Sequence, residues 1–145
     1  MNANQAVFLQ AGGGLPKLYM DLILFEGRYP MLFTCTDDGG NLYICSQYNV
    51  DGEKHQWVVE KTTSAKVIAM LSDRLTIREA FGEREENVFR VIRYSGNQTP
   101  SVQEITFEEA SREILPTAGA YMDSDEGEFD EEIWELRKRE HTIIF

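Results

Sequence analysis

The residues with the chemistry for nucleophilic catalysis are few, and they lie around one predicted pair of hairpins. Cys35 and Cys45 flank a turn at residues 37–41, and His55 follows a second turn at residues 50–52. A cysteine acts as a nucleophile when a nearby base removes its proton. One hypothesis is therefore an enzyme or a small-molecule-binding sensor with a site around these hairpins. Its candidate residues are Cys35, Cys45, Tyr43, Tyr48 and His55.

The spacing of the two cysteines favours a structural interpretation. If the turn is centred near Gly39, Cys35 lies opposite Tyr43 and Cys45 is its diagonal neighbour. A disulfide needs Cα atoms roughly 4.4 to 6.8 Å apart, and a diagonal pair is usually wider. The sequence therefore predicts two buried free thiols. Since no histidine stands in a metal-binding spacing either, we predict no catalytic residue, no metal, no cofactor and no enzyme activity.

One acidic motif begins like a calcium loop. Asp123, Asp125 and Gly127 are spaced as in the first half of such a loop. An EF-hand then requires glycine at its sixth position and glutamate at its twelfth. Those positions hold Glu128 and Trp134, so the motif leaves room for weak divalent binding and predicts no dedicated site.

Negative charge is concentrated near the end of the chain. The protein of 145 residues has a net charge of −11 at pH 7; residues 1–103 carry −2, residues 104–135 carry −11 and residues 136–145 carry +2. Acidity confined to one stretch creates a patch with a local field, whereas uniform acidity would only favour solubility. The candidate partner-binding residues are Asp123, Asp125, Glu126, Glu128, Asp130, Glu131, Glu132, Trp134 and Glu135.

This patch predicts a non-catalytic macromolecular-interaction protein that binds a basic protein surface through its acidic C-terminal third. The charge density approaches that of duplex DNA, which carries one negative charge per roughly 1.7 Å, so inhibitors, immunity or anti-defence proteins and nucleic-acid mimics are the expected classes. Phe129 and the terminal Ile143-Ile144-Phe145 would add apolar anchors. Direct nucleic-acid binding is not expected, because the arginines of residues 74–93 are matched by acids. A homodimer is an alternative use of the same surface.

The predicted fold is α+β, an antiparallel meander of about five strands with two or three short helices and a C-terminal helix. Short spacers and Asp-Gly turns join antiparallel neighbours, and imperfect alternation indicates that part of the sheet is covered on both faces. The predicted strands are 18–25, 31–36, 42–48, 56–61 and 87–94, with 102–106 as a further candidate.

Helical periodicity begins after Thr62, with Ser64 as the expected N-cap. Thr76 and Thr106 each precede a glutamate by three residues, which is the capping-box spacing. A final helix is predicted over residues 130–139. Its apolar stripe is Phe129, Ile133 and Leu136.

Three regions follow from these elements. Residues 1–16 are interpreted as a flexible N-terminal arm, because Gly12-Gly13-Gly14 lacks the Lys-Ser/Thr pair of a phosphate loop. Residues 17–116 form the core domain, and residues 117–145 form an acidic segment and a helix that pack on the core or extend it. The chain has no apolar run of about 18 residues and no signal-like N-terminus, so we expect a cytoplasmic protein without a membrane partner.

The chain also resembles a family of small bacterial domains of unknown function over roughly residues 17–95. The resemblance rests on Tyr29-Pro30-Met31-Leu32-Phe33, residues 38–43, Trp57-Val58-Val59 and residues 71–81. It implies a meander with helices and a prokaryotic or phage-like origin, and it implies no activity. The acidic C-terminal third lies outside it.

Overall fold

The structure, a computed structural model, describes residues 6–26, 30–51, 54–82, 88–95 and 99–143. One sheet contains every strand of the described chain, each strand pairs antiparallel with the next, and the order across the sheet follows the sequence. The predicted meander is therefore confirmed, with seven strands rather than about five. The strands are β1 (Val7–Leu9), β2 (Leu18–Glu26), β3 (Pro30–Thr36), β4 (Leu42–Asp51), β5 (Lys54–Thr62), β6 (Val88–Ser95) and β7 (Ser101–Thr106).

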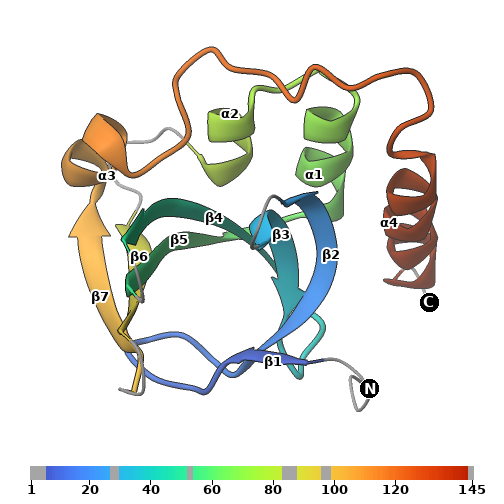
Figure 1. The fold of residues 1–145 in the computed structure, drawn as a ribbon. Helices are drawn as coiled ribbons and strands as arrows, with labels where there is room; N and C mark the ends of the chain where they lie inside the picture. Colours follow the sequence, from blue (N-terminus) through green and yellow to red (C-terminus); the bar gives the residue numbers. More distant parts are fainter. Residues whose placement is uncertain (1–5, 27–29, 52–53, 83–87, 96–98, 144–145) are drawn as a thin grey trace.

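Four helices accompany the sheet in the described residues. Three lie above one face of the sheet, and the last stands beside β2 and α1 (Figure 1). They are α1 (Ser64–Leu71), α2 (Ile77–Phe81), α3 (Phe107–Glu113) and α4 (Asp130–Ile143). The final helix begins where the sequence predicts and runs four residues further, because nothing in residues 140–143 stops a helix: neither Gly nor Pro occurs there.

The helix starts follow the local sequence. Thr63, rather than the predicted Ser64, caps α1, and its side chain accepts the backbone N–H of Lys66. Thr76 forms the complete capping box predicted for α2, with Glu79. Thr106 accepts the N–H of Glu109 at the start of α3. A side-chain acceptor at each start satisfies a backbone donor that the helix cannot pair itself.

The sheet curls strongly, so its two faces bury two separate apolar clusters. Figure 1 shows the curled strands and the helices outside them. The helix-side cluster joins residues of the sheet to residues of the four helices, and the inner cluster joins residues of strands β1 to β6 and of the loop after β1. Neighbouring residues alternate between the two: Ile44 belongs to the helix-side cluster and Cys45 to the inner cluster. Both faces of the central strands therefore need apolar residues, which explains the imperfect alternation in the sequence. The inner cluster comprises Leu9, Leu15, Leu18, Phe33, Cys35, Tyr43, Cys45, Val59 and Ile92.

The N-terminal region is not a flexible arm in its described part, so that prediction is wrong for residues 6–16. Val7 and Leu9 pair with β2, and Leu9 is buried in the inner cluster. Gly12 and Leu15 exchange two backbone hydrogen bonds of 2.9 and 3.0 Å. Gly13 lies against Val102 of β7, so this loop crosses from the β1 edge of the sheet to the β7 edge. The sequence missed it because glycines that permit a close approach look the same as glycines in a linker.

The turn between β3 and β4 is held by one carboxylate. Asp37 accepts hydrogen bonds from the backbone N–H groups of Gly39 and Asn41, and the Tyr43 hydroxyl donates to it at 3.2 Å. Burial alone would raise the pKa of Asp37, but the bonds from Asn41, Tyr43 and Gly39 lower it. Burial, followed by the nearby Asp37 charge, raises the pKa of Tyr43 to about 12.

We expect this tyrosine to couple folding to alkaline pH. Its ordinary pKa is 10.0 and its folded value is about 12, so the folded protein retains a proton that the unfolded chain loses. The stabilisation is complete below pH 10 and is lost as the pH rises toward 12. Burial also raises the pKa of Tyr48, so tyrosinate absorbance should show a late-titrating component that becomes smaller in Tyr43→Phe without disappearing. Stability should fall less steeply with pH in that variant. An unchanged titration curve in Tyr43→Phe would contradict the assignment.

Candidate functional site

The segment between α3 and α4 is fixed along the ends of α1 and α2. Arg78 donates to the carbonyl of Pro116 at 2.7 Å, and the N–H of Ile77 donates to the carbonyl of Ala120 at 2.9 Å. Further along, the Asp73 carboxylate accepts the backbone N–H groups of Asp123 and Ser124 at 2.9 and 3.1 Å. These bonds hold the beginning of the acidic stretch in a defined position over the helices (Figure 1).

Helix α4 is attached to the core by apolar contacts and by one ion pair. Leu136 and Phe129 are buried in the helix-side cluster and Ile133 packs against it, which confirms the predicted stripe. Arg139 donates two hydrogen bonds of 2.8 Å to the two carboxylate oxygens of Asp21 on β2. The Asp21 hydrogen bond raises the pKa of the Arg139 guanidinium. This contact links the end of α4 directly to the sheet.

Six of the eight predicted partner-binding carboxylates are exposed on this attached frame. A carboxylate that forms an ion pair within the protein contributes less negative charge to the patch. Within the described part of the chain, these carboxylates make one ion pair, between Glu135 and Arg139 at 3.4 Å. Because Arg139 is also held by Asp21, it offsets little of the patch's charge. Glu132 and Glu135 are half-buried, and the exposed members are Asp123, Asp125, Glu126, Glu128, Asp130 and Glu131.

Four of these carboxylates gather around an open groove beside β2. The groove has a volume of about 720 Å³ and is lined by the first turns of α4 and by Leu22 of β2. Trp134 is 64% exposed, and the Lys138 ammonium lies 5.2 Å from its ring centroid. The groove therefore combines negative charge with an exposed aromatic surface. Its lining is Leu22, Asp130, Glu131, Glu132, Trp134 and Glu135.

Two members of this surface were missed by sequence reasoning. Leu22 lines the groove from β2, and Asp73 adds a carboxylate at the point where Asp123 is anchored. Both lie far from the acidic stretch in sequence, and no local pattern marks either. Asp73 has a positive φ of 59°, a conformation that aspartate tolerates better than most residues. Of the predicted apolar anchors, Ile144 and Phe145 lie outside the described residues.

The alternative site around the central hairpins is not assembled. Cys35, Cys45 and Tyr43 are packed in the inner cluster, whereas Tyr48 packs against the helix-side cluster on the other face. The register is as predicted, with Cys35 opposite Tyr43. The two thiols are free and buried, with sulfur atoms 3.8 Å apart. Burial raises the pKa of the Cys45 thiol well above its ordinary value, which disfavours the reactive thiolate.

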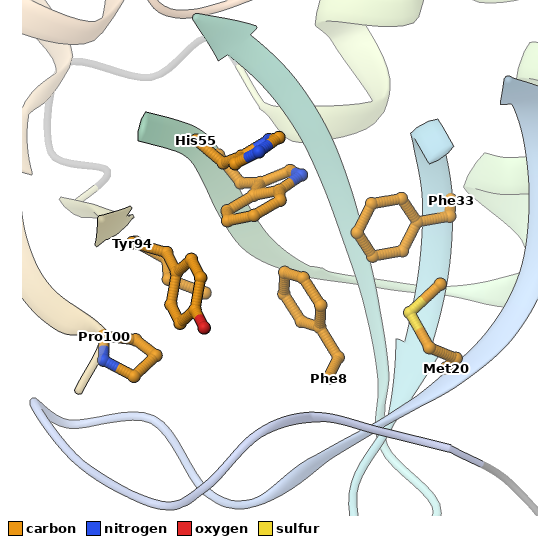
Figure 2. A pocket seen from close by; sticks show the side chains of 8 residues that line it. Phe8, Met20, Phe33, His55, Tyr94 and Pro100 are labelled. Atoms are coloured by element: carbon orange, nitrogen blue, oxygen red, sulfur yellow. The ribbon is translucent and has the colours of Figure 1, made fainter. Parts of the chain in front are cut away.

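His55, the remaining member of that set, lines a cavity inside the curled sheet instead. The cavity has a volume of about 340 Å³. Figure 2 shows Phe8 and Phe33 on one side and Tyr94 on the other, with His55 above. The His55 ring stacks on Trp57 at 5.6 Å between centroids, with an interplanar angle of 13°. Its Nδ1 atom lies 3.1 Å from the Gln47 side-chain nitrogen, so in the tautomer that accepts this bond the ring proton is on Nε2.

Among the described residues, no three histidine, cysteine or acidic side chains are grouped so that they would hold a metal ion. Every helix in the same residues is too short or too polar to span a bilayer.

Comparison with known proteins identifies one relationship. No curated protein matches the chain, and no solved structure matches it. A family model matches residues 8–144, so it includes the acidic segment and α4, which the resemblance over residues 17–95 left out. Because the match spans nearly the whole chain, the protein belongs to the family described as a family of unknown function, DUF6575.

Proposed function

We propose that this protein acts without catalysis, by binding a macromolecular partner with a basic surface through α4 and the acidic segment before it. The observation that carries the proposal is that seven of the eight carboxylates predicted for this surface make no ion pair within the described residues. Carboxylates that the protein does not neutralise itself retain a field that attracts and orients a cationic partner.

The groove beside β2 supports a protein partner with lysine or arginine side chains. A cation entering the groove meets the carboxylates of Asp130 and Glu131 and the exposed face of Trp134. Carboxylates form charge-assisted hydrogen bonds with guanidinium groups, and an indole face attracts cations. Tryptophan is also a frequent source of binding energy in protein interfaces. The Lys138 ammonium lies 5.2 Å from the Trp134 ring centroid, so a partner's cation that binds the same face must displace it.

The rigidity of the surface favours recognition of a folded partner. The acidic segment is tied to α1 and α2, and α4 is tied to β2, so little ordering is required on binding. The class of function that fits is an inhibitor, an immunity or anti-defence protein of bacterial or phage origin, or a mimic of nucleic acid that occupies a basic groove. A cytoplasmic location is part of this proposal.

The test compares two variants with the same change in net charge. In the first, Glu128, Glu131 and Glu132 become glutamine and Asp130 becomes asparagine. In the control, Glu26, Glu104 and Glu108 become glutamine and Asp38 becomes asparagine. All four are exposed and none lines the groove, and Glu104 and Glu108 form surface ion pairs with Arg90 and Arg112. Partners are captured from a lysate of the native host at two salt concentrations and identified, and the Kd of the purified partner is then measured.

We expect the groove variant to bind at least about tenfold more weakly than wild type, and to lose most of the salt dependence, because screened charge pairs supply the attraction. The control variant should retain the wild-type affinity and its salt dependence within about twofold. Equal binding by the two variants would refute the acidic surface as the binding site. Thermal melting of both variants verifies that each remains folded.

A further inference from the structure

The interior of the curled sheet is filled at one end and open at the other. Leu18, Cys35 and Val59 are completely or almost completely buried in the inner cluster. Further along the same strands, Met20 on β2, Phe33 on β3 and Trp57 on β5 line the cavity. Phe33 belongs to the inner cluster as well. The strands β5 and β6 pair His55 with Tyr94 and Trp57 with Ile92, so two consecutive inward-facing pairs form one wall.

The walls of the cavity are dominated by aromatic rings in defined contact. The Phe8 ring packs edge-to-face against both Phe33 and Trp57, with centroids 5.0 and 5.2 Å away. This arrangement is a preferred geometry for aromatic pairs, so the three rings stabilise one another in the positions that line the cavity. Tyr94 and Pro100 face Phe8 across the cavity (Figure 2).

The chemistry of the lining specifies the guest. No Asp, Glu, Lys or Arg is present among the described residues that line the cavity. A charged guest would lose its hydration without gaining a counter-charge, which is costly. A volume of about 340 Å³ lies at the small end of ligand pockets, which span roughly 300–1,000 Å³. Flat rings offer the largest contact with the aromatic walls, and Tyr94 and His55 can hydrogen-bond one polar group.

We propose that this cavity is a binding site for an uncharged, flat, mainly apolar small molecule with an aromatic ring system. The site lies inside the curled sheet and shares no lining residue with the groove on α4. A test of this site is therefore independent of the proposed function. Phe8, Phe33 and Trp57 would contact the rings of the guest, and Tyr94 and His55 would face its polar end.

The test uses two fluorescent probes that share one skeleton. N-phenyl-1-naphthylamine is neutral, and 1-anilinonaphthalene-8-sulfonate is the same ring system with a sulfonate. We expect the neutral probe to bind the full-length protein with strongly enhanced emission. The sulfonate should bind at least tenfold more weakly, because no Lys or Arg lines the site to pair with it. Equal enhancement of both probes would mean adsorption to loosely packed apolar surface and would overturn the proposal, as would binding of neither.

A matched pair of tyrosine variants locates the probe. Tyr94 lines the cavity, whereas Tyr121 is a comparably exposed tyrosine outside it, and their exposed fractions are 37% and 50%. Tyr94→Ala should weaken binding of the neutral probe roughly tenfold through loss of ring contact. Tyr121→Ala should leave it unchanged. If the two variants weaken binding equally, or neither does, the cavity is not the site. Melting curves verify that each variant is folded.

A second probe pair tests whether the site prefers a cationic guest, because aromatic cages also bind quaternary ammonium groups. Tert-butylbenzene and the phenyltrimethylammonium ion have the same shape and differ by one positive charge. The hydrocarbon should displace N-phenyl-1-naphthylamine at a concentration at least tenfold lower than the cation does. Stronger displacement by the cation would mean that the site prefers a cationic guest, and this result would overturn the proposal.

Discussion

Replacing Arg139 with methionine is expected to lower the free energy of unfolding by about 3 kcal/mol. Methionine retains most of the apolar volume of the arginine side chain, but the Asp21 carboxylate loses both of its hydrogen bonds to the guanidinium. The Asp21 side chain is only 4% exposed, compared with 29% for Arg139, so water cannot replace what is lost. The Thr34 hydroxyl, which donates to Asp21 at 2.8 Å, would be the remaining described side-chain donor.

Urea unfolding measures this loss, and hydrogen exchange shows where it acts. Because Arg139 connects α4 to β2, the amides of α4 should exchange much faster in Arg139→Met while those of the central strands change less. The matched control is Arg137→Met, two positions away on the exposed side of the same helix, which should change stability by no more than about 0.5 kcal/mol. Equal destabilisation by the two variants would show that the Asp21 contact contributes little.

Replacing Gly13 with alanine is expected to cost about 2–3 kcal/mol of stability. A Cβ atom at this position would lie 2.5 Å from the Cβ of Val102 and 3.1 Å from its carbonyl oxygen. The φ of Gly13 is also +58°, a conformation that alanine adopts at a cost. Since Gly13 lies where the loop after β1 meets β7, the substitution should separate the two edges of the curled sheet and loosen the inner cluster.

The neighbouring glycine provides the control. A Cβ atom added to Gly12 would meet nothing within 4 Å, so Gly12→Ala should stay within about 0.5 kcal/mol of wild type. Thermal unfolding of both variants gives the comparison. If both substitutions were equally tolerated, the loop would not be packed against β7, and residues 11–14 would behave as the linker that the sequence suggests.

Most elements of the fold were predictable because their signals are local. Turn residues and apolar runs located β2 to β6 to within a few residues, since a hairpin depends on positions that are adjacent in the chain. Thr76 and Glu79 specified the start of α2 for the same reason. Strand β1 was missed because a strand of three residues has too few positions to show a period.

The candidate site was predictable only in its charge. The concentration of acids before and within α4 is visible in the sequence, and the apolar stripe of that helix identified Leu136 as buried and left Trp134 outside. The participation of Leu22 and Asp73 was not predictable, because no repeat or motif relates positions so far apart along the chain.

The sequence by itself determined the succession of strands and helices, the free thiols and the location of the negative charge, since each depends on residue type and on neighbours along the chain. Tertiary structure alone decided that Asp21 holds Arg139, 118 positions away, and that Gly13 meets Val102. It also decided that the curled sheet leaves a cavity between Phe8 and Tyr94. Each contact joins segments that lie far apart in the sequence and meet only in the folded protein, so neither segment carries a periodic pattern that would reveal it.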